Sequence, residues 1–132
     1  SRDSQRSGIL AAGNWIVDQV KMVDAGRSAA LANISAQSDG TGGSPYNLLV
    51  NLAKLGVKFP LAAAGLVGQD AFGEYILDDL KAHKIDAANL KATAKAPTSY
   101  TDVMTEEDTG RRTFFYCRGA NALWAGQGLN FK

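Results

Sequence analysis

Cysteine and histidine are nearly missing from this sequence, and each shortage excludes a class of site. Cys117 and His83 are the only residues of their types. One cysteine cannot form an internal disulfide. A single unpaired cysteine fits a protein of a reducing compartment. His83 has no cysteine or acidic partner at metal-ligand spacing, and no motif pairs it with Cys117 for nucleophilic catalysis. The sequence therefore predicts no metal site and no catalytic cysteine in this chain.

Net charge and long apolar runs are also lacking. The chain has 14 basic and 13 acidic residues, a formal net charge of +1, which is not the basic bias of a nucleic-acid-binding protein. The longest apolar runs, such as Leu61–Val67, are much too short to span a bilayer. The first seven residues are polar, unlike the apolar core of a signal peptide. We expect one cytoplasmic domain, with neither nucleic acid nor membrane as a partner.

The first part of the chain has the pattern of strands. Gly8–Val17 is apolar and is followed by the polar residue Asp18, which predicts one buried strand that runs to a surface edge. Gln19–Gly40 has short apolar stretches on either side of a turn signal near residues 24–26. That pattern predicts two short strands joined by a turn.

A helix is predicted after the cluster of Gly, Ser and Pro that follows. Tyr46–Leu55 has leucines at helical spacing. Ser44 suits the N-cap, Pro45 suits the first helical position, and Gly56 suits the position after the last turn.

Strands and helices then alternate. Leu61–Val67 is predicted as a second buried strand, and Asp70 as the N-cap of a helix over Ala71–His83. Leu90–Ala94 is predicted as a further strand, and a short helix is predicted at Ala120–Ala125. A strand–helix–strand–helix order favours a parallel sheet with helical crossovers.

A hairpin is predicted near the end of the chain. Ser99–Thr105 and Arg112–Cys117 flank a polar turn in which Gly110 is free to adopt a positive φ. Alternation along both segments predicts a strand pair with one covered face. We expect that face to be apolar and to be formed by residues such as Tyr100, Met104 and Phe115.

Four segments, in this order, resemble the N-terminal part of the PfkB (ribokinase-type) carbohydrate kinases. Gly13–Asp18 (GNWIVD) is similar to the family's opening strand with its terminal sugar-binding aspartate. Gly42–Asn47 (GGSPYN) is similar to the family's Gly-Gly-x-x-x-Asn turn into a helix. Gly65–Gly73 (GLVGQDAFG) is similar to its G-x-x-G-x-D-x-x-G stretch, and Arg111–Asn121 (RRTFFYCRGAN) to its lid strand ending in R-G-A-N. The sequence departs from the family pattern at Leu49, where the signature prefers a small residue.

The resemblance implies a ribokinase-like α/β fold: a three-layer αβα sheet, present in part, with a small β-strand lid formed by about residues 19–40 and 98–118. Residues 1–132 would then be the N-terminal, sugar-binding part of the domain. The family's catalytic Gly-Ala-Gly-Asp segment does not occur here, so the resemblance implies that the catalytic base and the nucleotide-binding part are absent. ATP and Mg²⁺ would bind mainly to that absent part, and the lid would make a homodimer.

Candidate sugar-binding residues follow from chemistry and from the resemblance together. A carboxylate accepts from two adjacent hydroxyls, an amide both donates and accepts, and a Gly-Gly turn lets the backbone approach a ligand. A solvated acid at a strand end and an ordinary loop-to-helix turn are the plainer interpretations of the same residues. A phosphate loop is excluded because no Gly-Lys-Ser/Thr follows the glycines. With the resemblance, the candidates are Asn14, Asp18, Gly42, Gly43, Asn47, Tyr116 and Arg118.

The function expected from the resemblance is phosphoryl transfer from ATP to a sugar hydroxyl by the parent enzyme, with this chain alone inactive. Two alternatives remain open from the sequence. One is a non-catalytic sugar-binding or dimerisation module, and the other is a nucleoside kinase of the same fold.

Overall fold

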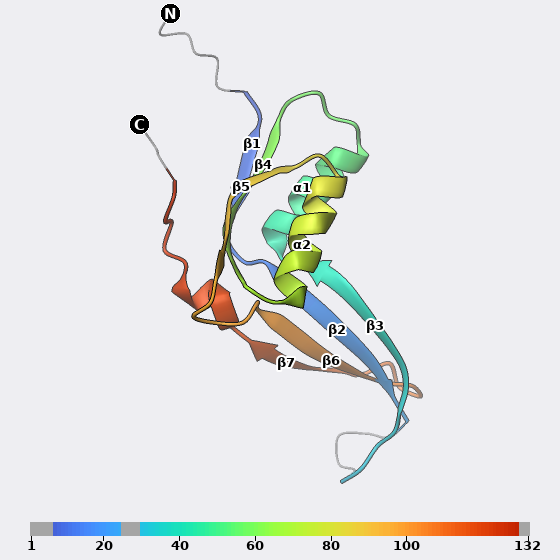
Figure 1. Ribbon diagram of the computed structural model, residues 1–132. Coiled ribbons are helices and arrows are strands. Elements are labelled where there is room, and N and C mark those ends of the chain that lie inside the picture. The colour runs from blue at the N-terminus through green and yellow to red at the C-terminus, as the bar shows by residue number, and fades with distance from the viewer. Residues whose placement is uncertain (1–6, 25–29, 130–132) are drawn as a thin grey trace, which may run out of the picture.

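Two β-sheets organise the chain, which a computed structural model describes over residues 7–24 and 30–129. The main sheet is parallel, with the strand order β1-β4-β5. Its strands are β1 (Ile9–Ala12), β4 (Leu61–Gly68) and β5 (Asp86–Thr93). Helices α1 (Ser44–Lys54) and α2 (Ala71–Ala82) lie side by side on one face of this sheet (Figure 1). The short 3₁₀ helix η1 (Gly119–Leu123) also contacts β4.

The second sheet, which we call the lid sheet, projects away from the main sheet (Figure 1). Its strand order is β3-β2-β6-β7, with β2 and β6 parallel and both outer pairs antiparallel. The strands are β2 (Ile16–Val23), β3 (Ile34–Gly42), β6 (Tyr100–Glu106) and β7 (Arg112–Cys117). The predicted turn near residues 24–26 lies largely outside the described residues.

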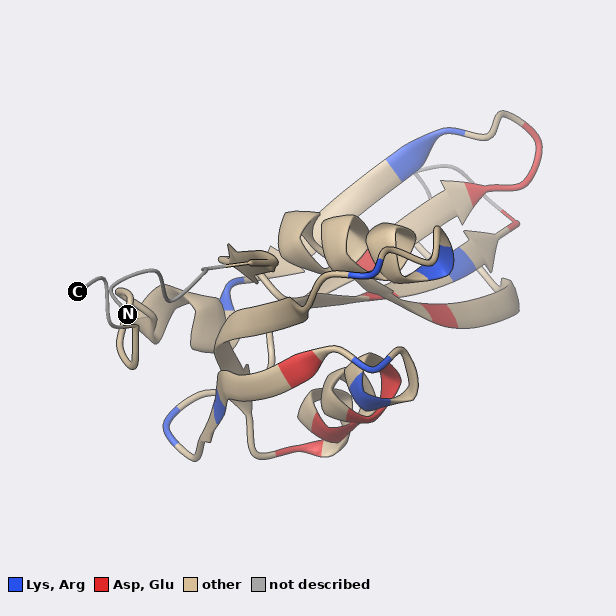
Figure 2. Cartoon of the chain, turned by 90° about the horizontal axis from the view of Figure 1, so that it is seen from above, with Lys and Arg blue, Asp and Glu red and all other residues tan. Residues whose placement is uncertain are grey.

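Charges of both signs are mixed over the molecule. Figure 2 shows Lys and Arg interspersed with Asp and Glu on α2 and on the lid sheet, whereas Lys54 is the one charged residue of α1. Lys21 and Asp102 form an ion pair across β2 and β6, with 2.9 Å between Nζ and Oδ1. In the part of the chain that the structure describes, neither α-helix is long and apolar enough to cross a membrane.

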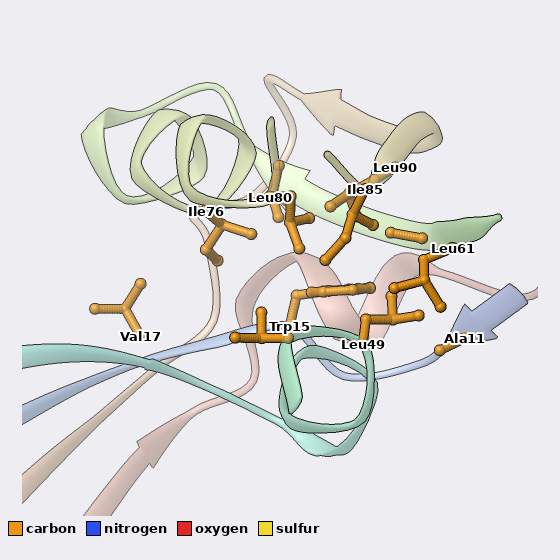
Figure 3. Close-up of a cluster of buried hydrophobic side chains, with 12 residues drawn as sticks. Ala11, Trp15, Val17, Leu49, Leu61, Ile76, Leu80, Ile85 and Leu90 are labelled. Atoms are coloured by element: carbon orange, nitrogen blue, oxygen red, sulfur yellow. The ribbon is translucent and has the colours of Figure 1, made fainter. Parts of the chain in front are cut away.

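Trp15 stands at the centre of the core, between α1 and the main sheet (Figure 3). Its side chain is 0% exposed, and its indole Nε1–H donates to the carbonyl of Ala64 at 2.8 Å. Gly65 gives the indole its space, because a Cβ atom there would stand 2.4 Å from Trp15 Nε1. Buried residues of α1, α2 and the main sheet complete the cluster, among them Leu49, Leu61, Ile76, Leu80, Ile85 and Leu90.

Helix α2 forms as predicted. Asp70 is its N-cap, and the Asp70 carboxylate accepts from the backbone N–H of Gly73 at 2.8 Å. Two hydrogen bonds from Thr98 reach the same carboxylate, one from its backbone N–H and one from its hydroxyl. Burial alone would raise the pKa of Asp70, but these three hydrogen bonds lower it below the usual value.

Several predicted boundaries were wrong. The apolar run at residues 8–17 is not one strand, because the chain leaves the main sheet at Gly13 (φ 130°) and enters the lid sheet at Ile16. Helix α1 has Gly43, not Ser44, as its N-cap, and no side chain caps it. Strand β5 begins at Asp86, four residues before the predicted start. The predicted helix at residues 120–125 is the 3₁₀ helix η1.

The hairpin is confirmed, and Gly110 has the expected positive φ of 69°. Its apolar face was assigned wrongly. Side chains that pair directly across strands share a face, so Tyr100, Met104 and Phe115 share their face with the ion pair of Lys21 and Asp102. The opposite face is the more apolar one, with Val20, Val103 and Phe114 paired in a row.

Candidate functional site

Asp18 lies where the lid sheet meets the main sheet. The sequence placed it at the end of a strand, whereas it is the third residue of β2. The register pairs Asp18 with Gly40 on one side and with Thr101 on the other, and Thr101 pairs with Tyr116. Directly paired residues share a face of a sheet. Asp18, Thr101 and Tyr116 therefore form a polar row across three strands of the lid sheet.

Gly42 lies against the carboxylate of Asp18. A Cβ atom at Gly42 would stand 2.7 Å from Asp18 Oδ2, which is closer than real Cβ atoms approach other atoms. The missing side chain at Gly42 is thus what leaves room for this carboxylate. Burial raises the pKa of Asp18 above its usual value. A partly desolvated carboxylate of this kind has a strong demand for hydrogen-bond donors such as sugar hydroxyls.

Gly43 joins the backbone of Asn14 to the start of α1. It has a φ of 97°, and a Cβ atom there would stand 2.0 Å from the Asn14 carbonyl oxygen. Only glycine fits such a site without a backbone shift. The Gly43 carbonyl accepts from the backbone N–H of Asn47 at 3.0 Å, which closes the first turn of α1. The N–H groups ahead of Asn47 are those that a helix leaves without partners of its own.

The structure thus brings four of the seven predicted sugar-binding residues into one contact cluster: Asn14, Asp18, Gly42 and Gly43. Asn47 lies on the first turn of α1 with an exposed side chain. Tyr116 is 47% exposed and shares the face of Asp18, two strands away. Arg118 is exposed just beyond β7, and its backbone carbonyl accepts from the hydroxyl of Ser99. This cluster contains a carboxylate, one asparagine and a backbone without side chains at Gly42 and Gly43, and hydrogen-bonding groups of these kinds suit a polyol.

Thr101 and Asn121 were missed as site-related residues. Thr101 is 9% exposed and is the direct β6 neighbour of Asp18. The register alone places its side chain on the face of the sheet that carries Asp18, and strand alternation would have indicated this once the β2–β6 pairing was known. Asn121 was noted only as part of the R-G-A-N segment, yet its side chain binds the backbone of Trp15.

A metal site was not predicted in this chain. Among residues 7–24 and 30–129, no three side chains of His, Cys, Asp or Glu come together in a way that could hold a metal ion.

The family described as pfkB family carbohydrate kinase matches residues 8–132 of this chain. Among curated proteins, probable fructokinase-7 of Arabidopsis thaliana is 30% identical over 122 residues, which are 92% of this chain and 34% of that protein. The fructokinase of Salmonella typhimurium is 32% identical over 92 residues, which are 66% of this chain and 29% of that protein. The chain thus spans about a third of the length of these relatives.

Solved structures show the same fold. A fructokinase of Halothermothrix orenii is 28% identical and superposes with a TM-score of 0.70, over 85% of this chain and 38% of that one. A ribokinase of Arabidopsis thaliana, complexed with ribose and ATP, superposes with a TM-score of 0.75 at 21% identity, over 84% of this chain and 36% of that one. These superpositions confirm the predicted ribokinase-like α/β fold. The match over residues 8–132 establishes that this chain belongs to the pfkB family of carbohydrate kinases.

Proposed function

We propose that this chain is the sugar-binding part of a longer, ATP-dependent sugar kinase. The single observation that carries the proposal is the contact cluster at the base of the lid sheet, where the Asp18 carboxylate lies against Gly42 beside the start of α1. The reaction transfers the γ-phosphoryl group of ATP to one sugar hydroxyl. Such transfers depend on positioning and electrostatics, and this chain supplies the positioning of the acceptor.

Each residue of the cluster has a role in this proposal. The Asp18 carboxylate accepts hydrogen bonds from two adjacent sugar hydroxyls, and Asn14 and Asn47 add amide contacts. Gly42 and Gly43 let the sugar approach the backbone where α1 begins. Tyr116, in the row that contains Asp18, and Arg118 after it cover the sugar from β7. An arginine in that place is suited to a sugar acid, because guanidinium groups pair with carboxylates.

ATP and Mg²⁺ complete the proposed reaction, with Mg²⁺ neutralising the charge on the phosphates. In the described residues no acidic cluster is suited to a metal ion, so we place both groups on parts of the longer protein outside this chain. No residue of this chain is given a role toward them. It follows from the proposal that the 132-residue chain alone does not phosphorylate sugars.

Fructose is the first acceptor to test, because two relatives reported above are named fructokinases. The measurement is coupled ADP release by the longer protein, with fructose, ribose, a sugar acid and adenosine as separate acceptors. We expect turnover with a sugar or sugar acid and none with the isolated chain. Turnover with adenosine alone would instead make the protein a nucleoside kinase. No turnover with any acceptor, together with measurable sugar binding, would make it a sugar-binding module.

A homodimer formed through the lid sheet is part of the same proposal. Val20, Val103 and Phe114 lie in a row on the face that also carries Asp18. Val103 is buried, but Phe114, at the outer end of the row on β7, is 61% exposed, and an exposed aromatic side chain on a projecting sheet favours association with another surface. A second lid sheet offers a matching apolar face, because a two-fold interface uses the same patch on both copies.

A further inference from the structure

We propose that Asn121 is a positioning residue for the sugar site: its side-chain amide fixes the backbone that carries Asn14 and Asp18. The inference rests on the proposed function and names a residue that holds the site without touching the sugar. The observations that carry it are two hydrogen bonds to one backbone residue and the position of that residue between the two sheets.

The amide of Asn121 binds both polar backbone groups of Trp15. The Trp15 N–H donates to Asn121 Oδ1 at 3.2 Å, and Asn121 Nδ2 donates to the Trp15 carbonyl at 3.2 Å. A neighbouring β-strand pairs with the backbone N–H and C=O of a residue in the same way, through one acceptor and one donor. Two residues further on, the Val17 N–H donates to the carbonyl of Ser99 at 3.1 Å, where pairing with β6 begins. Asn121 therefore provides backbone hydrogen bonds to the residue just before β2, where β6 has not yet begun.

Trp15 lies on the only link between β1 of the main sheet and β2 of the lid sheet. Gly13, at the start of this link, has a φ of 130°, and a Cβ atom there would meet nothing within 4 Å. Because a glycine can adopt many backbone conformations, Gly13 alone does not fix the direction in which the chain continues from β1 to β2. The indole of Trp15 is held by Ala64 on the main-sheet side, and Asn121 holds the backbone of the same residue. The indole and the backbone of Trp15 are thereby both fixed, at the point where the link meets β2.

The two predicted sugar-binding residues on this segment lie next to that anchor. Asn14 precedes Trp15, and its carbonyl oxygen lies where a Cβ atom of Gly43, at the start of α1, would stand. Asp18 follows three residues later, with its carboxylate against Gly42. A shift of the Trp15 backbone therefore moves the carboxylate relative to the helix start. An error of about 1 Å in such a site can cost on the order of 100-fold in rate.

Asn121 is itself held firmly. Its backbone N–H lies within 3.2 Å of both the Arg118 carbonyl and the Ser99 hydroxyl. The preceding residue, Ala120, is fully buried and donates from its N–H to the Pro97 carbonyl at 2.7 Å. Gly119 takes a φ of 48° to make this close approach. The turn after β7 thus delivers the amide to a fixed point beside Trp15.

The test uses the longer protein and three variants: Asn121→Ala, Asn121→Asp and the control Asn51→Ala, whose asparagine is exposed on α1. We expect Asn121→Ala to raise KM for fructose by about tenfold, the equivalent of one hydrogen bond lost to a charged group. KM for ATP stays within about twofold, since the nucleotide is proposed to bind elsewhere. Asn51→Ala leaves both values unchanged.

Asn121→Asp keeps the shape of the side chain, so it also serves if the alanine variant does not fold. Its carboxylate accepts the Trp15 N–H but opposes the Trp15 carbonyl, and protonation of the new carboxyl restores the missing donor. Partial burial and the facing Trp15 carbonyl raise the pKa of the new carboxyl above its ordinary value. We therefore expect its KM for fructose, divided by the wild-type value at the same pH, to fall as the pH is lowered from 8 toward that raised pKa. A residue that only stabilises the fold would change the active fraction and leave this ratio constant.

Three results would overturn the inference. An active wild type whose fructose KM is unaffected by Asn121→Ala removes the positioning role and leaves the proposed function standing. Equal loss of kcat for every substrate at constant KM also removes it, because that pattern reports unfolded protein. A wild type that phosphorylates no sugar overturns the proposed function itself, and the positioning role with it.

Discussion

The carboxylate of Asp18 occupies the space that a side chain at Gly42 would fill. A Cβ atom at Gly42 would stand 2.7 Å from Asp18 Oδ2, whereas one at Gly43 would stand 2.0 Å from the backbone oxygen of Asn14. The first collision is with the end of a side chain, which can move. The second is with backbone, at a residue whose φ of 97° is strained for any side chain. A substitution at Gly42 should therefore change mainly the site, whereas one at the adjacent Gly43 should change mainly the stability of the fold.

We predict opposite profiles for alanine at these two glycines. Gly42→Ala displaces the Asp18 carboxylate, so KM for the sugar rises several-fold or more while the melting temperature changes little. Gly43→Ala lowers the free energy of unfolding by more than about 1 kcal/mol, because alanine is incompatible with the backbone there. Sugar kinetics and thermal melts of both variants of the longer protein decide this. A Gly42→Ala variant with wild-type KM would show that the carboxylate does not need its observed position.

Removal of the Asp18 carboxylate tests the sugar contact directly. Asp18→Ala in the longer protein should lower kcat/KM for the sugar by about one to two decades, the cost of a lost charged hydrogen bond of about 1.5–3 kcal/mol. Steady-state kinetics with fructose measure this, and Asp39→Ala, an exposed acid on the neighbouring strand β3, is the matched control. Unchanged sugar kinetics in a folded Asp18→Ala variant would remove Asp18 from the site.

The raised pKa of Asp18 gives a pH dependence of known sign. Burial disfavours the charged form, so the carboxyl takes up its proton above the ordinary value of 3.8. The protonated acid is a poorer acceptor, and kcat/KM for the sugar should fall as the pH is lowered through this raised pKa. A raised pKa also means that the ionised group opposes folding above that pKa, and that the penalty vanishes below the unfolded value. Asp18→Asn should therefore melt higher than the wild type at pH 7, and the difference should close at low pH.

Local chemistry made parts of this fold predictable. The N-cap of α2, the leucine spacing of α1 and the glycine in the hairpin turn are all decided within a few residues, and each was predicted correctly or within one residue. The break in the apolar run at Gly13–Trp15 was not predictable in this way. Both strands that it joins are apolar there, and the indole of Trp15, where the chain turns, binds Ala64, which is 49 residues away in the sequence.

The candidate site likewise has features that the sequence could predict and features that depend on contacts between distant segments. Asp18, Gly42 and Gly43 could be named from the sequence because a family resemblance supplied them. Their contact depends on pairing between β2 and β3, and the place of Thr101 depends on pairing between β2 and β6, some 80 residues apart. The residues that share each face of the hairpin were predicted correctly, but the choice of which face is the more apolar one was not. Which face carries Lys21 and which carries Val20 is fixed only by the pairing of β2 with β6.

Asp70 is predicted to stabilise the fold rather than to bind the sugar. Its carboxylate caps α2 and accepts two hydrogen bonds from Thr98, so it ties the helix start to the entry of β6. Asp70→Ala should lower the free energy of unfolding by about 2 kcal/mol. The lowered pKa of Asp70 means that this contribution is present above the unfolded pKa and is lost as the pH falls through the folded one.

Chemical denaturation of the longer protein at pH 7 and at pH 3 measures the contribution of Asp70. Asp78→Ala, at an exposed position on the same helix, is the control and should be nearly neutral. Sugar KM should not change in either variant. A loss of sugar affinity in a stable Asp70→Ala protein would contradict the structural role.

The lid sheet offers a matched pair of residues for the proposed dimer. Phe114 and Phe115 are neighbours on β7 with similar exposure, 61% and 58%, and they lie on opposite faces. Phe114 is in the row of Val20 and Val103, whereas Phe115 is paired with Asp102 on the face of the ion pair with Lys21. If the apolar face is the dimer interface, Phe114→Lys places a charge within it, and an unpaired buried charge is strongly unfavourable. The same change at Phe115 adds a lysine to a face that is already charged.

We expect sedimentation of the longer protein to show a dimer for the wild type and for Phe115→Lys, and a monomer for Phe114→Lys. Dissociation by Phe115→Lys alone would place the interface on the other face, and a monomeric wild type at high protein concentration would remove the dimer from the proposal.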